Sequence, residues 1–117
     1  MRLAYLSSSL IPSQQANSVH VMRMCQAFAQ QGHEVVLFAR KPDTPAKEDD
    51  FEYYGVKKSF ELRKLAWPKV RGLGGLLYGR KAYKMLSNGG FDAAYGRDLY
   101  SLYWSRKLGI PLYYESH

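Results

Sequence analysis

The amino-terminal part of the chain constrains the fold most, because it alternates strand-like and helix-like patterns. Residues 2–6 form an apolar run that predicts a buried strand ending in the serines 7–9. Over residues 18–31 apolar side chains recur at the helical period, and Gly32 follows as a C-terminal stop. Residues 34–39 are again apolar, which suits a parallel strand covered on both faces. Strand, helix and strand in succession predict a right-handed βαβ unit, whose first loop opens where such folds bind ligands.

The remaining patterns predict further strands and helices in alternation. Strands are expected over 59–65, 91–96 and 111–115, helices over 70–88 and 99–108, a loop over 41–50 and a turn over 53–56. Asp98 is placed to cap the last helix. At 117 residues, we expect one α/β domain: a Rossmann-like doubly wound parallel sheet of about five strands in the order 3-2-1-4-5. The apolar last strand predicts an interior position, and hence a chain that is part of a longer protein.

Charge indicates which partners the chain could bind, and cysteine content indicates the compartment in which it works. The chain has a formal net charge of +7, and basic residues crowd into 57–84, where Glu61 is the only acid. With Leu73 and Leu77 on the basic side of the predicted helix, this region suits contact with an anionic membrane surface; the alternative is a solvated basic face over core leucines. The single cysteine fits a reducing cytoplasm, so we expect a cytoplasmic protein, which in the first case is peripheral at the inner face of the membrane. Cys25, the one cysteine, excludes an internal disulfide and is expected in the core.

Polar residues follow three of the predicted strands, at the edge where open α/β sheets bind ligands. Residues 7–17 follow the first strand, Arg97 follows the fourth, and Ser116 and His117 follow the fifth. His20 lies in the first turn of the first helix, near its partly positive end. The candidate substrate-binding residues are Ser9, Asn17, Ser18, His20 and Arg97.

The first loop also argues against several classes of enzyme. It contains no glycine, so it lacks both the G-x-G-x-x-G dinucleotide turn and the P-loop. His20, His33 and His117 have no metal-ligand spacing, and His33 is expected to be structural. Tyr53 and Lys57 match the Y-x-x-x-K spacing of short-chain dehydrogenases, but they flank a predicted turn, which marks the match as accidental.

Four segments, in this order and spacing, resemble the N-terminal domain of family 4 glycosyltransferases of the GT-B fold. They are residues 11–21 (IPSQQANSVHV), 32–35 (GHEV), 91–92 (FD) and 114–117 (YESH). The resemblance covers nearly the whole chain, least over 43–84. It implies a Rossmann-like acceptor-side domain over residues 1–117, incomplete and without the C-terminal domain that binds most of a nucleotide-sugar donor.

The resemblance also implies roles for individual residues. His117 matches the histidine that faces the cleft and contacts the transferred sugar, so it is the candidate catalytic residue. Residues 10–18 match the loop beside donor phosphate or acceptor, although Ala16-Asn17 stands where many members have Gly-Gly. Such enzymes typically retain anomeric configuration and need no metal or cofactor beyond the nucleotide sugar. Without the donor domain, we expect this chain alone to be inactive.

Two alternatives remain open from the residues themselves. The first is a non-catalytic α/β binding module that uses its basic face for phosphate-rich ligands or nucleic acid; the tyrosines, however, lie mostly in predicted strands and helices rather than on a stacking platform. The second is a flavodoxin-like receiver domain, which lacks the expected acidic cluster after the first strand. An unpaired edge of the sheet would also allow a homo-oligomer.

Overall fold

The computed structural model describes residues 1–42 and 49–115, and one parallel sheet forms its centre. The strands are β1 (Arg2–Leu10), β2 (Glu34–Arg40), β3 (Glu61–Leu65), β4 (Ala93–Gly96) and β5 (Leu112–Tyr114). Their order is β3-β2-β1-β4-β5, and every neighbouring pair is parallel. The predicted α/β Rossmann-like sheet and its strand order are confirmed.

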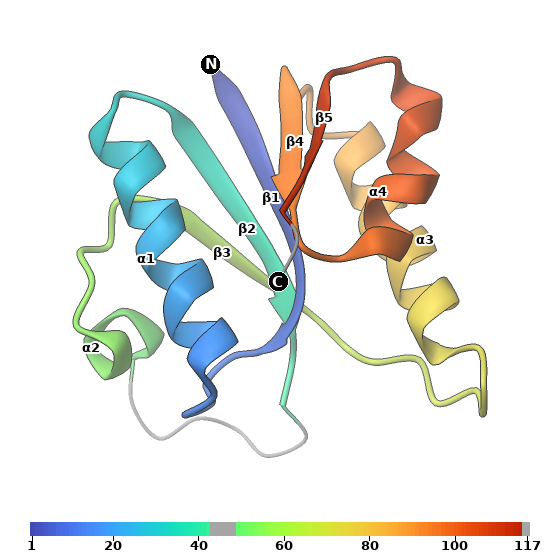
Figure 1. The fold of residues 1–117 in the computed structure, drawn as a ribbon, viewed down its shortest axis with the longest axis horizontal. Helices are drawn as coiled ribbons and strands as arrows, with labels where there is room; N and C mark the ends of the chain where they lie inside the picture. Colours follow the sequence, from blue (N-terminus) through green and yellow to red (C-terminus); the bar gives the residue numbers. More distant parts are fainter. Residues whose placement is uncertain (43–48, 116–117) are drawn as a thin grey trace.

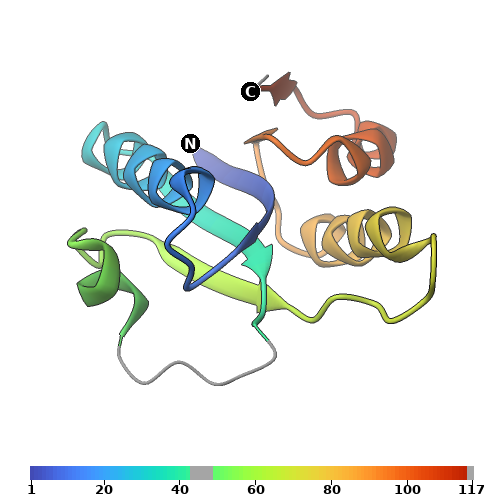
Figure 2. The same cartoon turned by 60° about the horizontal axis from the view of Figure 1, so that its bottom comes forward.

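Helices cover both faces of this sheet (Figures 1 and 2). They are α1 (Ala16–Gln30), α2 (Asp50–Tyr54), α3 (Gly74–Ser87) and α4 (Leu99–Ser105), which continues into the 3₁₀ turn η1 (Arg106–Leu108). Alternating side chains of each strand enter opposite cores: Leu3 and Tyr5 pack on the side of α1, and Ala4 and Leu6 on the side of α3. This double burial explains the nearly unbroken apolar runs of β1 and β2.

The first strand was predicted over residues 2–6, ending in the serines 7–9, and in the structure it runs through these serines to Leu10. Ser7 is buried, and its polar groups find partners inside the fold: the Ser9 amide donates to Ser7 Oγ (3.0 Å), and Tyr78 Oη donates to the Ser7 carbonyl (2.6 Å). Satisfied in this way, serines extend a buried strand at little cost. The strand ends one residue beyond the serines, and the partner that allows it to continue through Ser7, Tyr78, is distant in the sequence.

A short helix, α2, stands where a turn was predicted over residues 53–56. The Asp49 side chain caps it by accepting from the Phe51 amide (2.8 Å), and Gly55, with φ of 65°, ends it in the left-handed region. Phe51 packs against Phe60, with ring centroids 5.0 Å apart. One turn of helix is too short to show a helical period, so tertiary packing decides it.

The second half of the chain differs from the prediction in two places. α3 begins at Gly74 rather than at residue 70, because the glycine-rich start forms a loop in which Gly72 has φ of 78°. β5 was expected inside the sheet, yet it is the outermost strand among the described residues, and Tyr113 and Tyr114 are exposed.

Two further predictions concern the core and the caps. Asp98 caps α4 as predicted, its carboxylate accepting from the Ser101 amide (3.2 Å). Cys25 is fully buried, and burial raises the pKa of its thiol, as befits a core residue.

Within residues 1–42 and 49–115, no helix is both long and apolar enough to cross a bilayer.

Candidate functional site

A cluster centred on Glu115 occupies the edge where β1, β4 and β5 end. Glu115 directly follows β5, and its Oε1 lies 2.7 Å from Nε2 of His20 in the first turns of α1. The same oxygen lies 3.4 Å from Nε of Arg97, which directly follows β4. The other oxygen, Oε2, accepts a hydrogen bond from Tyr95 Oη (2.9 Å). Parallel strands thus bring residues distant in the sequence to one carboxylate.

The sheet itself sets the positions of Arg97 and Glu115. Their amides bond across neighbouring strands: Arg97 N donates to the Leu6 carbonyl (3.0 Å), and Glu115 N donates to the Gly96 carbonyl (2.7 Å). Gly96 lies so close to β1 that a Cβ there would stand 2.1 Å from the Leu6 carbonyl oxygen. Only glycine allows this approach, so the sequence of β4 fixes the place of the following arginine.

The start of α1 places His20 beside the cluster. Ser18 is buried, and its hydroxyl donates to the Leu10 carbonyl (2.8 Å), which ties the helix to the end of β1. Gln15 precedes the helix without a side-chain capping bond, so the amides of the first turn have no side-chain cap. The side chain of His20 is 45% exposed and reaches outward from this turn to Glu115.

The structure therefore separates the predicted substrate-binding residues into two groups. His20 and Arg97 meet at Glu115. Ser9 and Ser18 are buried with their hydroxyls bonded inside the chain, Ser9 Oγ lying 2.8 Å from Ser7 Oγ. Asn17 is exposed at the start of α1. His117, the predicted catalytic residue, lies outside the described residues, two positions beyond Glu115.

Electrostatics at the cluster follow from partial burial. The side chain of Arg97 is only 13% exposed and faces Glu115, so its charge lies near an opposite charge away from most of the solvent. The pKa of the Tyr95 hydroxyl is raised, first by burial and then by its hydrogen bond to the Glu115 carboxylate and by that negative charge. Burial also raises the pKa of Tyr5, which packs against Tyr95 with ring centroids 5.4 Å apart. Raised pKa values keep both hydroxyls neutral; Tyr95 Oη donates to Glu115, whereas the buried Tyr5 Oη has no hydrogen-bond partner among the described residues.

This arrangement can recognise polar ligands. A guanidinium donates to phosphate or carboxylate oxygens, a carboxylate accepts from hydroxyl groups, and an imidazole does either. In the described part of the chain, no group of three or more His, Cys, Asp or Glu side chains is placed to hold a metal ion. His33 precedes β2 and therefore lies at the opposite edge of the sheet, away from the cluster.

Glu115 and Tyr95 were missed by the reasoning from sequence. Glu115 was assigned to the end of the fifth strand and Tyr95 to the interior of the fourth, with no role for either. A signal was present: Arg97 and Glu115 both directly follow strands predicted to be neighbours, and opposite charges at such positions favour a pair. The contact with His20, 95 positions away, had no local signal.

Comparison with known proteins places this chain in a family. The sequence profile of Glycosyltransferase Family 4 matches residues 18–117. The chain belongs to glycosyltransferase family 4. The match includes His20, Arg97 and Glu115, so the whole cluster lies within the part shared with this family. A glycosyltransferase-like role is therefore supported.

Two other comparisons bear on this family 4 chain. A search of curated proteins found no match. Among solved structures, the C-terminal domain of a hydrogenase from Pyrococcus furiosus is similar, with a TM-score of 0.62 and 11% sequence identity, covering 98% of this chain and 90% of that one. At this identity the likeness shows the fold alone.

Proposed function

We propose that this chain is the acceptor-side domain of an enzyme that transfers a sugar from a nucleotide-sugar donor to an acceptor with retention of anomeric configuration. The cluster of His20, Arg97 and Glu115 at the carboxyl edge of the sheet carries the proposal, because family 4 membership alone names no site. In this proposal the edge faces a second, donor-binding domain of the GT-B fold. Donor and acceptor then meet between the two domains.

Each residue of the cluster has a proposed role. Arg97 attracts the phosphate oxygens of the donor, since a guanidinium binds phosphate in a fixed geometry. Glu115 accepts from a sugar or acceptor hydroxyl and holds Arg97 and His20 in place. His20 is the most exposed of the three side chains and contacts the acceptor. His117, following shortly after Glu115, is proposed to contact the transferred sugar.

The buried serines have a different role in this proposal. The hydroxyls of Ser9 and Ser18 are bonded within the chain, so these residues shape the end of β1 and the start of α1 rather than bind substrate. Asn17 is exposed beside them and is kept as a substrate-binding candidate. The proposed donor is a co-substrate, and no metal ion or resident cofactor takes part.

The proposed reaction is a single exchange of bonds at the anomeric carbon of the donor sugar. The bond to the donor phosphate oxygen breaks, and the nucleoside diphosphate leaves with the bonding electron pair. A bond to an acceptor oxygen forms on the same face of the sugar, and the proton of that oxygen passes to the leaving phosphate oxygen. Arg97 stabilises the charge that develops on the leaving phosphate, which is where fixed positive charge accelerates such a step.

A panel of nucleotide sugars, read out by mass spectrometry of the products, tests this function. The protein encoded by the full reading frame should transfer sugar, whereas the 117-residue chain alone should not. Glu115→Gln should lower transfer by about tenfold or more, because it removes the charge that orients Arg97 and His20. Glu34→Gln, at the opposite edge of the sheet, is the matched control and should leave transfer unchanged.

Two results would contradict the proposal. Transfer by the 117-residue chain alone would show that no donor-binding domain is needed. Equal activity of Glu115→Gln and Glu34→Gln would show that the cluster is not the site.

A further inference from the structure

Positive charge is concentrated in one segment of this chain. Between Glu61 and Asp92 the sequence holds seven of its 17 Lys and Arg residues and none of its ten Asp and Glu residues. The rest of the chain has equal numbers of both signs, so this segment accounts for the whole net charge of +7. The seven are Arg63, Lys64, Lys69, Arg71, Arg80, Lys81 and Lys84.

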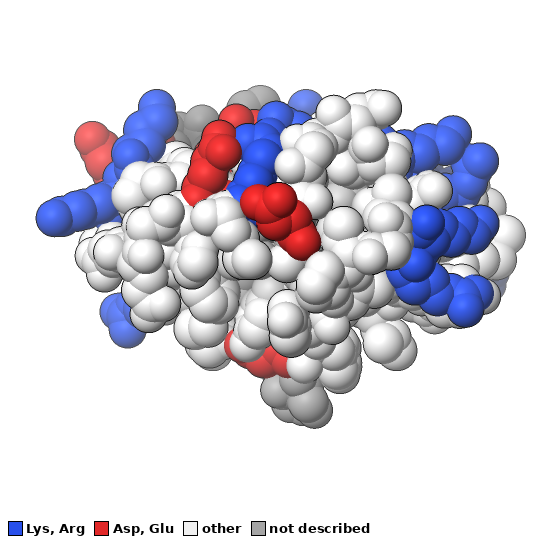
Figure 3. Space-filling model, turned by 90° about the horizontal axis from the view of Figure 1, so that it is seen from above, with Lys and Arg blue, Asp and Glu red and all other residues white. Residues whose placement is uncertain are grey.

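Five of these cations have no acidic partner among the described residues. Arg63 pairs with Glu61, and Lys64 Nζ lies 2.7 Å from Asp50 Oδ2. The others are exposed on the loop after β3 and on α3: Lys69, Arg71, Arg80, Lys81 and Lys84. Figure 3 shows Lys and Arg side chains gathered on the side of the molecule where α3 and α4 lie.

The helical period of α3 separates a packed face from a free face. Tyr78, Ala82 and Leu86 are buried against the sheet. The positions opposite them, at the period of 3.6 residues, hold Leu73, Leu77, Arg80 and Lys84, with Lys81 at the margin. Leu73 is 50% exposed. The free face of α3 therefore combines apolar side chains at its start with cations along its length.

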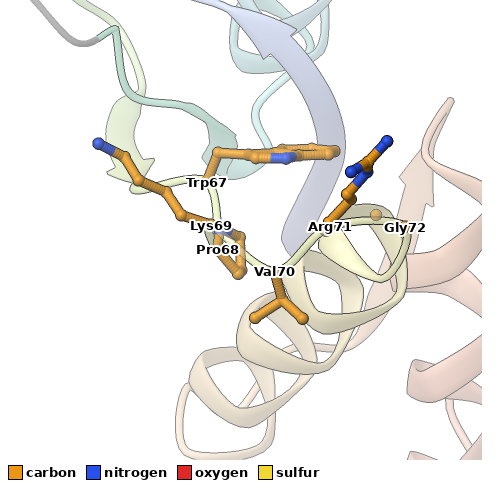
Figure 4. A pocket seen from close by; sticks show the side chains of 8 residues that line it. Trp67, Pro68, Lys69, Val70, Arg71 and Gly72 are labelled. Atoms are coloured by element: carbon orange, nitrogen blue, oxygen red, sulfur yellow. The ribbon is translucent and has the colours of Figure 1, made fainter.

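The loop before α3 continues this surface. Residues 67–72, Gly74 and Gly75 line an open pocket of about 470 Å³, in which Lys69 and Arg71 extend on either side of the Trp67 indole and Val70 points away from it (Figure 4). Val70 is 46% exposed. Lys81 Nζ donates to the Ala66 carbonyl (3.4 Å), which links the loop to α3. Loop and helix thus present one mixed surface of cations and apolar side chains.

We propose that residues 69–73 and the free face of α3 form a docking surface for an anionic phospholipid bilayer. The cations complement the negative headgroups, and Val70 and Leu73 enter the boundary between headgroups and acyl chains. Because the loop leaves β3 at the carboxyl edge of the sheet, docking here sets that edge beside the bilayer (Figure 1). The proposal concerns adsorption alone and does not depend on sugar transfer.

A bilayer fits this surface better than a nucleic acid does. Base stacking needs a free aromatic face, but the Trp67 ring is occupied: it stacks on Tyr78 at 5.4 Å, and the Arg40 guanidinium lies 4.5 Å from its centroid. The most exposed apolar side chains of the surface are aliphatic. Aliphatic side chains gain from contact with lipid and gain little from contact with a phosphate backbone.

Co-sedimentation with vesicles tests the docking surface. The chain should bind vesicles of mixed phosphatidylglycerol and phosphatidylcholine at low salt and dissociate from them at high salt. It should not bind vesicles of phosphatidylcholine alone. The triple variant Arg80→Gln, Lys81→Gln, Lys84→Gln should lose roughly fivefold in partitioning per charge removed. The control variant Arg23→Gln, Lys57→Gln, Lys58→Gln removes the same charge from other exposed positions and should lose clearly less.

A second variant separates lipid insertion from charge. Val70→Ser, Leu73→Ser keeps every cation, so its salt dependence should be unchanged while its partitioning falls by about tenfold. Circular dichroism confirms that each variant is folded. The proposal is overturned by no sedimentation of the unmodified chain at low salt, by equal losses in the test and control triple variants, or by a DNA duplex that binds more tightly than the vesicles.

Discussion

Nε2 of His20 lies 2.7 Å from Oε1 of Glu115, although 95 positions separate the two residues in the sequence. The contact joins the start of α1 to the end of β5 across the carboxyl edge of the sheet. The same carboxylate reaches Arg97 and Tyr95, whose side chains are less exposed than that of His20. The cluster therefore has an exposed side at His20 and a more protected side at Arg97.

The two sides of the cluster should contribute differently to stability. His20→Ala should lower the free energy of unfolding by less than about 1 kcal/mol, because exposed ion pairs contribute little. Glu115→Ala should cost more, roughly 1–3 kcal/mol, because the Tyr95 hydroxyl loses its acceptor and the partly buried Arg97 loses its opposite charge. Urea denaturation of both variants measures the difference. A larger loss for His20→Ala than for Glu115→Ala would contradict this ranking.

Both the ring and the hydroxyl of Tyr78 should contribute to the free energy of unfolding. The ring is fully buried, and Oη donates to the Ser7 carbonyl at 2.6 Å. Tyr78→Phe keeps the ring but leaves that carbonyl without its donor, which should lower the free energy of unfolding by about 1–2 kcal/mol. Tyr103→Phe, on an exposed tyrosine of α4, is the control and should change stability by less than about 0.5 kcal/mol. If Tyr78→Phe and Tyr103→Phe lowered stability equally in thermal or urea unfolding, the hydrogen bond to Ser7 would not contribute as proposed.

Gly96 should tolerate no side chain. A Cβ there would stand 2.1 Å from the Leu6 carbonyl oxygen, and backbone cannot move aside as a flexible side chain can. Gly96→Ala should therefore cost about 3 kcal/mol or more by forcing β4 away from β1. Ser8→Ala, on an exposed residue of β1, should be nearly neutral in the same unfolding measurement. A stable Gly96→Ala variant would mean that the two strands can separate without loss.

Asp98 should make stability depend on pH in an uncommon direction. Burial raises the pKa of its carboxyl, while hydrogen bonds from the Ser101 hydroxyl and amide oppose that shift. A raised folded-state pKa means that the folded chain binds this proton more tightly than the unfolded chain does. The contribution of Asp98 to the unfolding free energy should therefore rise as pH falls through the raised pKa toward the usual carboxyl value, and stay level above it.

Comparison with Asp98→Asn isolates this effect. Because asparagine at this position does not titrate and can still cap α4, the stability of the original chain relative to the variant should improve on acidification. Ser101→Ala removes the opposing hydroxyl bond and should move the effect to higher pH. Urea unfolding across a series of pH values measures both changes. A relative loss of stability on acidification would show that the folded-state pKa is lowered.

Much of the fold was predictable because its signals are local. The apolar runs of β1 and β2, the helical period of α1 and the capping aspartate before α4 each occupy adjacent positions in the sequence. The start of α3 was misplaced because its glycines allow both loop and helix. α2 was missed because one turn is decided by its packing on Phe60 rather than by its own pattern.

The candidate site was predictable only in its location. The carboxyl edge of the sheet follows from strand order, and His20 and Arg97 were placed there correctly. Which polar groups remain free at that edge depends on partners elsewhere in the chain. The Ser18 hydroxyl donates to the Leu10 carbonyl, and the Ser9 hydroxyl is bonded to that of Ser7. The hydroxyls of two predicted binding residues are therefore bonded within the chain.

By itself, the sequence determined the order of strands and helices, the parallel sheet and the edge at which a ligand would bind, because periodicity and chain connectivity are properties of neighbouring residues. Only the tertiary structure decided that Glu115 joins His20, Arg97 and Tyr95 at that edge. The physical reason is that the contacts of a carboxylate depend on which polar groups the packed strands place near it. At Glu115 those groups come from separate elements of the chain.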